Sequence, residues 1–234
     1  MPMGLNDTRT RVIVGSSSAI AQAFIDSLKQ TTSDQLITVS SRCDADIHCD
    51  YTDDSIHEAV TQIPEGPIDL HIFNGQLCLD QQMPEKRISE LDYRYFNELM
   101  RINCWIPMQF IRLVTPRLMK KTPCDISVLS ARVGSVDDNR LGGWYSYRAS
   151  KAALNQMFKS ASIEIIRRNP EAKFLAFHPG TTESPLSAPF QQNVPSNKLF
   201  SPEFVGSQLL KVLSSLEAKP EAQFIDWDNK QIRW

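Results

Sequence analysis

Two residues with the types and spacing needed for acid–base chemistry stand in the stretch GGWYSYRASKAALN. Tyr147 and Lys151 are four positions apart in a segment of helical period, so a helix would place the phenol and the ammonium on one face. A neighbouring ammonium favours the phenolate and lowers the pKa of a tyrosine from its ordinary value of about 10. The pair therefore predicts a group that gives a proton to, or takes one from, an alcohol oxygen.

A second stretch, RVIVGSSSAIAQAF, begins like a strand that turns at Gly15 into a helix. Helix starts of this kind bind phosphate through free N–H groups and the helix dipole. Ala19 and Ala21 stand where such loops usually carry glycine, and we expect the serines between Gly15 and Ala19 to add hydroxyl donors. This pattern predicts a working but modified phosphate-binding turn.

Composition excludes several classes of function. The chain has 234 residues, 41% of them hydrophobic, with a net charge of −2 and no block of Lys and Arg, so nucleic acids and anionic membranes are poor partners. It carries no signal-peptide pattern and no apolar run approaching the roughly 20 residues of a membrane span. Five scattered cysteines and four histidines show no ligand spacing. We therefore expect a cytoplasmic protein with reduced thiols and no metal site.

Short apolar runs alternate with segments of helical period, which predicts a parallel sheet flanked by helices. The expected strands are Val12–Gly15, Leu36–Ser40, Asp46–Cys49, Ile68–Phe73, Ile126–Leu129, Phe174–Phe177 and Gln223–Asp226. The expected helices are Ala19–Gln30, Asp54–Gln62, Leu91–Lys120, Ser146–Arg168 and Pro202–Leu216. No repeat or linker divides the chain, so we expect one domain over residues 1–234.

Two polar segments follow expected strands and interrupt the alternation of strands and helices. They are Arg132–Gly143 and Gly180–Leu199. In doubly wound folds ligands bind beyond the carboxyl ends of the strands, where both segments begin. The second is long enough that we expect it to cover a site.

The order of these motifs resembles that of the short-chain dehydrogenase/reductase superfamily over nearly the whole chain. VGSSSAIA matches the Thr-Gly-x-x-x-Gly-x-Gly turn, HCDYTD the adenine contact, MRINCWIPMQF the helix with the active-site asparagine, YSYRASK the Tyr-x-x-x-Lys motif and FHPGTTES the segment beneath the nicotinamide. MPEKRI, SAPFQQNVP and FIDWDNKQIRW further resemble the C-factor-like subgroup. The resemblance implies an α/β, Rossmann-type doubly wound parallel sheet of about seven strands, with its cofactor half at about 8–125 and its catalytic and substrate part at about 126–234. It also implies hydride transfer between a nicotinamide and a small carbonyl or alcohol substrate.

The resemblance also implies roles for individual residues. Tyr147 would be the acid/base, and Lys151 would lower its pKa and hold the nicotinamide ribose. Asn103 would anchor a proton-relay water, and Pro107, four residues later, fits the same pattern.

The catalytic serine is displaced relative to the family pattern. Aligned on Gly134, the usual serine position holds Ala131, and Ser130 precedes it. We predict Ser130 as the catalytic serine, with Ser135 as the alternative.

Arg42 ends the expected strand LITVSSR, where NAD-specific relatives carry an acidic residue. A guanidinium suits a 2′-phosphate, so NADP(H) is the preferred cofactor, with NAD(H) possible. HIFNGQL departs from the family's Asn-Asn-Ala-Gly but keeps Gly75. The cofactor-binding residues predicted from the resemblance are Gly15, Ser17, Ser18, Ala19, Ile20, Ser41, Arg42, Asp50, Tyr51, Asn74, Gly75, Tyr147, Lys151, Pro179, Gly180, Thr182 and Ser184.

These departures leave a second hypothesis open, a non-catalytic dinucleotide-binding signalling or regulatory protein on the same fold. The resemblance also implies a homodimer, or a tetramer, assembled through Leu91–Lys120 and Ser146–Arg168. We expect Arg132–Tyr145 and Ser184–Leu199 to shape the substrate pocket. These segments mix Trp144, Leu186 and Phe190 with polar side chains, which predicts a modest, partly apolar carbonyl substrate.

Overall fold

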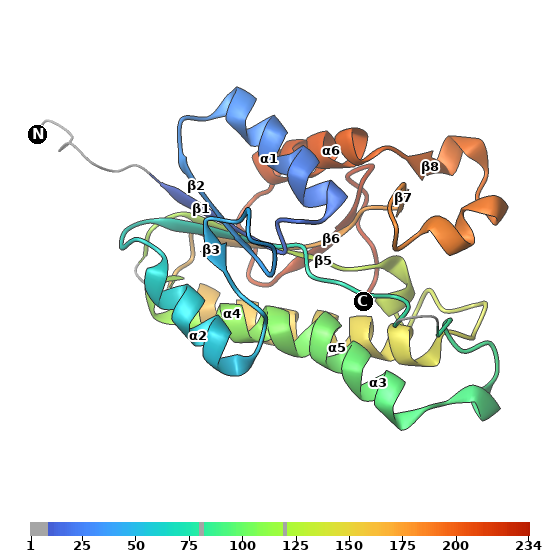
Figure 1. The fold of residues 1–234 in the computed structure, drawn as a ribbon. Helices are drawn as coiled ribbons and strands as arrows, with labels where there is room; N and C mark the ends of the chain where they lie inside the picture. Colours follow the sequence, from blue (N-terminus) through green and yellow to red (C-terminus); the bar gives the residue numbers. More distant parts are fainter. Residues whose placement is uncertain (1–8, 80–81, 119–120) are drawn as a thin grey trace, which may run out of the picture.

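A seven-stranded parallel sheet forms the centre of the molecule (Figure 1). The computed structural model describes residues 9–79, 82–118 and 121–234. The strand order is β3-β2-β1-β4-β5-β6-β9, which confirms the predicted Rossmann-type fold. The strands are β1 (Thr10–Val14), β2 (Gln35–Ser40), β3 (Ile47–His48), β4 (Ile68–Ile72), β5 (Cys124–Leu129), β6 (Ala172–His178) and β9 (Gln223–Asp226).

Helices cover both faces of the sheet, as Figure 1 shows. On one face lie α1 (Ala19–Thr31) and α6 (Pro202–Ser215), and on the other lie α2 (Asp53–Gln62), α4 (Ile106–Leu118) and α5 (Tyr145–Ile166). One apolar cluster fills each interface, with Phe24 and Leu209 in the first and Phe110 and Phe158 in the second. Because both faces are covered, side chains on both sides of a central strand are buried, and all five residues of β4 are buried, Asp69 and His71 among them.

In the sheet, β2 lies on one side of β1 and β4 lies on the other. This reversal of strand order opens a crevice beyond the carboxyl ends of β1 and β4, the place where ligands bind in doubly wound folds. Gly15 and Asn74, which follow these two strands, lie at this crevice.

The prediction of one continuous helix over Leu91–Lys120 is wrong in the middle of this segment. It consists of α3 (Tyr93–Met100), a π-helical turn (Arg101–Trp105) and α4, and the predicted end at Lys120 lies outside the described residues. The N–H of Ile106 donates to the carbonyl oxygen of Arg101, five residues earlier. Pro107 gives the physical reason, since it has no N–H for the carbonyl of Asn103 and disfavours a regular α-helical turn.

The long segment Gly180–Leu199 contains short ordered elements. Two parallel strands, β7 (Thr181–Thr182) and β8 (Leu199–Phe200), tie its ends together, and the N–H of Glu183 donates to Phe200 at 2.9 Å. Between them lie the 3₁₀ helices η4 (Ala188–Asn193) and η5 (Ser196–Lys198). The remaining 3₁₀ turns of the described chain are η1 (Ile88–Glu90) and η3 (Arg132–Gly134). A segment closed in this way is held beside the carboxyl edge of the sheet.

Gly206 allows α6 to pack directly on α1. A Cβ at this position would lie 2.7 Å from the carbonyl carbon of Ala23 and from the N of Phe24. Because backbone cannot yield as a side chain can, Gly206→Ala should lower the free energy of unfolding by about 1–3 kcal/mol, the usual range for overpacking. Urea denaturation measures this, with the neighbouring Ser207→Ala as the control. Equal stability of the two variants would contradict this packing.

Candidate active site

Tyr147 lies in the first turn of α5, with 9% of its surface exposed. The chain enters this helix through Gly142 and Gly143, both at φ +64°. Trp144 follows, also in the left-handed region, and offers no side-chain cap to the helix. This entry gives the phenol a fixed position at the start of the helix.

The missing cap comes from Glu85, 61 residues earlier in the sequence. Its buried carboxylate accepts a hydrogen bond from the N–H of Ser146 at 3.2 Å and another from the Ser146 hydroxyl. Its main-chain carbonyl accepts from the N–H of Trp144. Sequence reasoning missed this residue, because a single glutamate in MPEKRI gives no local signal that it will reach a distant helix start.

Lys151 lies one turn after Tyr147 and is 3% exposed. Its Nζ donates to the carbonyl oxygen of Leu129 at 2.9 Å, which ties α5 to the end of β5. Gly75 approaches the same group, since a Cβ there would lie 3.4 Å from Nζ. Burial lowers the pKa of Lys151 to about 8.

The predicted lowering of the Tyr147 pKa is wrong for this structure. Burial raises the pKa of the phenol above its ordinary value. The ammonium of Lys151 is directed to the Leu129 carbonyl instead. A protonated phenol is therefore the stable form of this tyrosine.

Asn103 lies in the π-helical turn and is completely buried. Its Nδ2 donates to the Gln76 carbonyl at 2.8 Å and to Ser150 Oγ at 3.0 Å, and its Oδ1 accepts from the N–H of Gln76 at 2.7 Å. The side chain is thus committed to holding the segment after β4. The main-chain carbonyl of Asn103 has lost its helical donor at Pro107.

The two candidate serines have their hydrogen bonds elsewhere. The Ser130 hydroxyl donates to Asn155 Oδ1 at 2.6 Å, and the Ser135 hydroxyl accepts from the N–H of Asp138 at 3.1 Å. Ala131 instead packs against the apolar cluster that contains Tyr147. The catalytic role of a serine stays a prediction, and neither hydroxyl is shown at the phenol.

The expected phosphate-binding turn is formed by the start of α1. Gly15 has φ +74°, and a Cβ there would lie 2.9 Å from the N of Asn74. Ser18 caps the helix, its hydroxyl accepting from the N–H of Ala21 at 3.2 Å, while Ser17 is exposed. Ala19 and Ile20 are half-buried at the first helical positions. Free N–H groups of this first turn can hold a pyrophosphate even without the second and third glycines.

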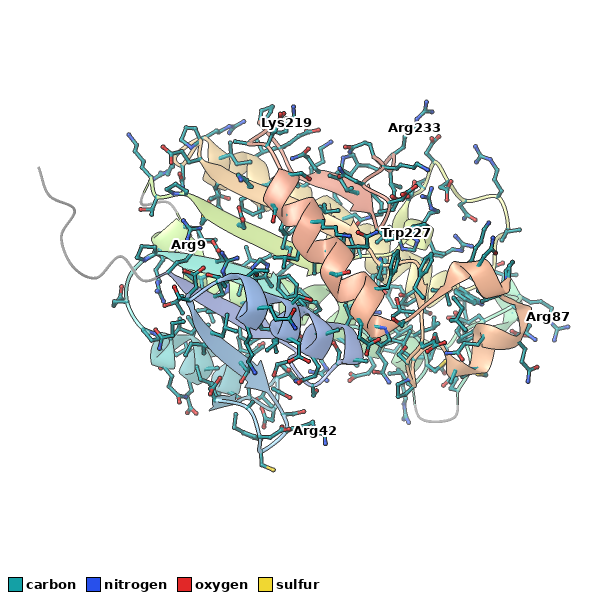
Figure 2. All side chains as sticks on the ribbon, turned by 90° about the horizontal axis from the view of Figure 1, so that it is seen from above. Arg9, Arg42, Arg87, Lys219, Trp227 and Arg233 are labelled. Atoms are coloured by element: carbon teal, nitrogen blue, oxygen red, sulfur yellow. The ribbon has the colours of Figure 1, made fainter. Side chains whose placement is uncertain are left out.

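Ser41 and Arg42 extend into solvent beyond β2, and Figure 2 shows Arg42 at the outer edge of the molecule. The Arg42 side chain is 68% exposed, and its Nε lies 4.0 Å from Asp44. Asp50 holds the start of α2, because its carboxylate accepts from the N–H of Thr52 at 2.9 Å and from the Thr52 hydroxyl at 2.7 Å. The guanidinium is therefore the more available of the two charges.

Tyr51 has φ +65°, a conformation that a bulky residue rarely adopts. Its half-buried ring packs edge-on against Phe110, and burial raises the pKa of its phenol. The hydroxyl approaches Gly15 and Asn74 across the crevice. Tyr51, Gly15 and Asn74 thus lie together at the carboxyl edge of β1, β3 and β4, while Ser41, Arg42 and Asp50 are exposed.

The segment after β6 supplies the other end of this crevice. Pro179 leads to Gly180 at φ +72°, where a Cβ would lie 2.7 Å from the Phe200 ring. Ser184 Oγ donates to the Thr182 carbonyl at 3.3 Å. The Thr182 hydroxyl is buried and has no hydrogen-bond partner among the described residues. Because an unpartnered buried hydroxyl is costly, it fits a site where a ligand amide completes the bond.

Three comparisons place this geometry among known proteins. The family model described as short chain dehydrogenase matches residues 5–195. The 1-hydroxy-2-glutathionyl-2-methyl-3-butene dehydrogenase of Rhodococcus sp. is 28% identical over 160 residues, covering 68% of this chain and 65% of that protein. C-signal of Myxococcus xanthus is 26% identical over 179 residues, covering 74% and 97%. The crystal structure of an NADPH-bound carbonyl reductase from chicken fatty liver is 18% identical, with a TM-score of 0.80 over 98% of this chain and all of that one.

Other kinds of site find less support. Among the described residues no three His, Cys, Asp or Glu side chains gather as metal ligands would. All five cysteines are free. Within the same part of the chain, no helix combines the length and the apolar character needed to cross a membrane.

The buried ammonium of Lys151 should make stability depend on pH. Its pKa is about 8 in the fold and about 10.4 when unfolded, so the unfolded chain binds more protons between these values. The free energy of unfolding therefore rises as the pH increases from about 8 to about 10.4, and it is lower below pH 8. Relative to wild type, Lys151→Met should be most stabilising near pH 7 and least near pH 10. Unfolding free energies measured at both values test this, since groups common to both proteins cancel, and a constant difference would contradict it.

Proposed function

Because the chain belongs to the short-chain dehydrogenase family, we propose that it is an NADP(H)-dependent oxidoreductase acting on small carbonyl or alcohol compounds. One observation carries the proposal. Tyr147 stands one helical turn before Lys151, whose ammonium lies beside Gly75 at the carboxyl edge of the sheet. This is the constellation that carbonyl reduction requires, a proton donor and a cation beside a dinucleotide crevice.

The residues have distinct tasks in this proposal. A bound nicotinamide supplies or accepts the hydride. Tyr147 donates its proton to the carbonyl oxygen in reduction and takes it back in the reverse reaction. The phenol of Tyr147 is protonated and so carries the proton that reduction needs, while burial, by raising its pKa, makes it a weaker acid than a free tyrosine. Lys151 uses one donor on Leu129, and its remaining N–H groups can hold the nicotinamide ribose. Thr182 is the group we assign to the nicotinamide amide.

Proton return to Tyr147 needs a path through the protein. We assign it to the Asn103 main-chain carbonyl, which Pro107 leaves without its helical donor. Asn103 and Lys151 flank the same glycine, since a Cβ on Gly75 would lie 3.7 Å from the side-chain Oδ1 of Asn103 and 3.4 Å from the ammonium of Lys151. The Asn103 side chain positions this carbonyl by its bonds to Gln76.

The choice of NADP(H) over NAD(H) rests on the exposed Arg42 and on the lack of an acid at the end of β2. We also propose that the protein belongs to the C-factor-like subgroup, is located in the cytoplasm and forms a homodimer. Trp105 and Met157 expose apolar surface on the turn before α4 and on α5, the helices expected at the dimer interface.

A non-catalytic signalling role on the same fold is the second candidate. One observation favours it, since Ala131 replaces the usual serine beside the Tyr147 cluster. It requires dinucleotide binding without turnover.

Tyr147→Phe separates the two candidates. Removing the proton donor should lower kcat for NADPH-dependent reduction by about 10²–10⁴-fold, while NADPH binding followed by fluorescence stays within about twofold. The matched control is Tyr145→Phe on the same helix. A wild-type protein that binds NADPH tightly yet oxidises none with any carbonyl compound would favour the signalling role.

Arg42→Ala tests the cofactor preference. Losing a charge-assisted contact to the 2′-phosphate, worth about 1.5–3 kcal/mol, should raise Kd for NADPH by about 10–100-fold and leave Kd for NADH unchanged. Calorimetric titration measures both. Arg87→Ala is the control, because that exposed arginine lies far from Arg42 (Figure 2). Equal loss for both cofactors would assign Arg42 another role.

A further inference from the structure

Glu85, in the stretch MPEKRI, is a buried acidic residue that the proposed mechanism does not use. Only 2% of its surface is exposed, and among the described residues its carboxylate forms no ion pair. A buried carboxylate is costly unless hydrogen bonds satisfy it. Its partners therefore indicate its task, and both of them lie on Ser146, the residue next to Tyr147.

The start of α5 differs from the starts of four other helices in the described part of the chain. Each of those four begins with a side chain that accepts a hydrogen bond from the N–H three positions later, the usual local cap. The caps are Ser18 for α1, Thr52 for α2, Asp92 for α3 and Ser201 for α6. Helix α5 has Trp144 in this position, with no side-chain cap and no acidic residue in its first turn. The helix that carries Tyr147 thus takes its anchor from a distant segment.

The two oxygens of the Glu85 carboxylate bind two groups of one residue. One oxygen accepts from the N–H of Ser146 at 3.2 Å, and the other accepts from the Ser146 hydroxyl. Ser146 is completely buried, so solvent does not compete for these groups. Two bonds to one residue fix both the position and the direction of the first turn, and the negative charge suits the positive end of the helix dipole.

The segment that carries Glu85 is itself held in place. The Glu90 carboxylate accepts from the N–H of Lys86 at 2.8 Å. The main-chain carbonyl of Glu85 accepts from the N–H of Trp144, and this bond does not depend on the Glu85 side chain. The carboxylate therefore acts on Ser146 alone, and a substitution of Glu85 leaves the main-chain contact in place.

The entry to α5 gives the first turn little support of its own. Gly142 and Gly143 both have φ +64°, and Trp144 follows at φ +53°. Glycines lose more conformational freedom on ordering than other residues do, so an entry of this kind needs an external anchor. The Glu85 carboxylate is that anchor.

Loss of the carboxylate would separate the two members of the acid–base pair. The buried N–H and hydroxyl of Ser146 would lose their partners, and the first turn would have to shift or admit water to satisfy them. Lys151, one turn further along, would stay in place because its ammonium is bonded to the Leu129 carbonyl. The phenol of Tyr147 would then move relative to the ammonium.

We propose that Glu85 is a positioning residue for acid–base catalysis by Tyr147. Its carboxylate fixes the first turn of α5 through Ser146 and so sets the direction of the phenol. This rests on the proposed function, in which the phenol protonates the carbonyl oxygen. The turn that would hold the dinucleotide phosphates lies at the start of α1, so cofactor binding does not depend on Glu85.

Glu85→Ala and Glu85→Gln test the proposal as a pair, in NADPH-dependent reduction of 2,3-butanedione or of whichever small carbonyl compound the wild-type protein reduces fastest. Alanine removes both bonds, so kcat should fall about 10²-fold, while the Kd for NADPH stays within about twofold. The glutamine oxygen can accept from the Ser146 N–H, and its amide can donate to the Ser146 oxygen. Glutamine should therefore keep at least about a tenth of the wild-type kcat. Equal losses in the two variants would overturn the proposal.

Hydrogen exchange and a stability control separate positioning from a general loss of structure. In Glu85→Ala the amides of Ser146 and Arg148 should exchange at least about tenfold faster, while those at the centre of α5 keep their wild-type rates. The control is Gly206→Ala, which loosens α6 against α1 on the other face of the sheet from α5 (Figure 1). It should lower the free energy of unfolding and leave kcat unchanged. If all of α5 exchanges faster in Glu85→Ala and the Kd for NADPH rises with it, Glu85 only stabilises the fold and the proposal is wrong.

Failure of the proposed function gives a different result. A wild-type protein that binds NADPH but reduces no carbonyl compound has no proton transfer to position, and the oxidoreductase itself is then wrong. If the wild type reduces the compound and Glu85→Ala reduces it equally fast, the oxidoreductase stands and the positioning role is wrong.

Discussion

All seven strands run in one direction, and the candidate site depends on that constraint. Parallel strands bring their carboxyl ends to a single edge, so segments far apart in the sequence meet there. Gly15 follows β1, Gly75 follows β4, Ala131 follows β5 and Gly180 follows β6. Helix α5 is then fixed against this edge by the bond from Lys151 to Leu129. Without the common direction of the strands, Tyr147 would have no crevice to face.

Burial shifts the two groups of the acid–base pair away from their charged forms. It raises the pKa of Tyr147 and lowers that of Lys151 to about 8, because a low dielectric disfavours phenolate and ammonium alike. A dinucleotide brings phosphate charge to the crevice, and a nearby anion favours the ammonium. Binding of the proposed cofactor would thus oppose the effect of burial and raise the pKa of Lys151. With a pKa of about 8, Lys151 is largely protonated at neutral pH, so the fold keeps a buried cation, and the phenol of Tyr147 stays protonated beside it.

Much of the fold and part of the site were predictable from local patterns. The period of the apolar residues predicts the strands and most helices, and the spacing of Tyr147 and Lys151 is a helical one. The π-helical turn was not predicted, because the apolar pattern runs on through Asn103 while the missing N–H of Pro107 changes the backbone. The cap from Glu85 joins residues 61 positions apart, and no local signal announces such a contact. The pKa direction of Tyr147 failed for a related reason, since spacing does not reveal that the ammonium bonds to Leu129.

The departures from the family pattern fall on side chains, while the backbone features persist. Ala19 and Ala131 are changes of side chain, yet the left-handed Gly15, the free start of α1 and the left-handed Gly180 remain. Backbone N–H groups hold phosphate whatever side chain stands beside them, so dinucleotide binding can survive these changes. The hydroxyl lost at Ala131 has no backbone substitute. The changes of side chain therefore bear on the proposed proton transfer at Tyr147 more directly than on dinucleotide binding.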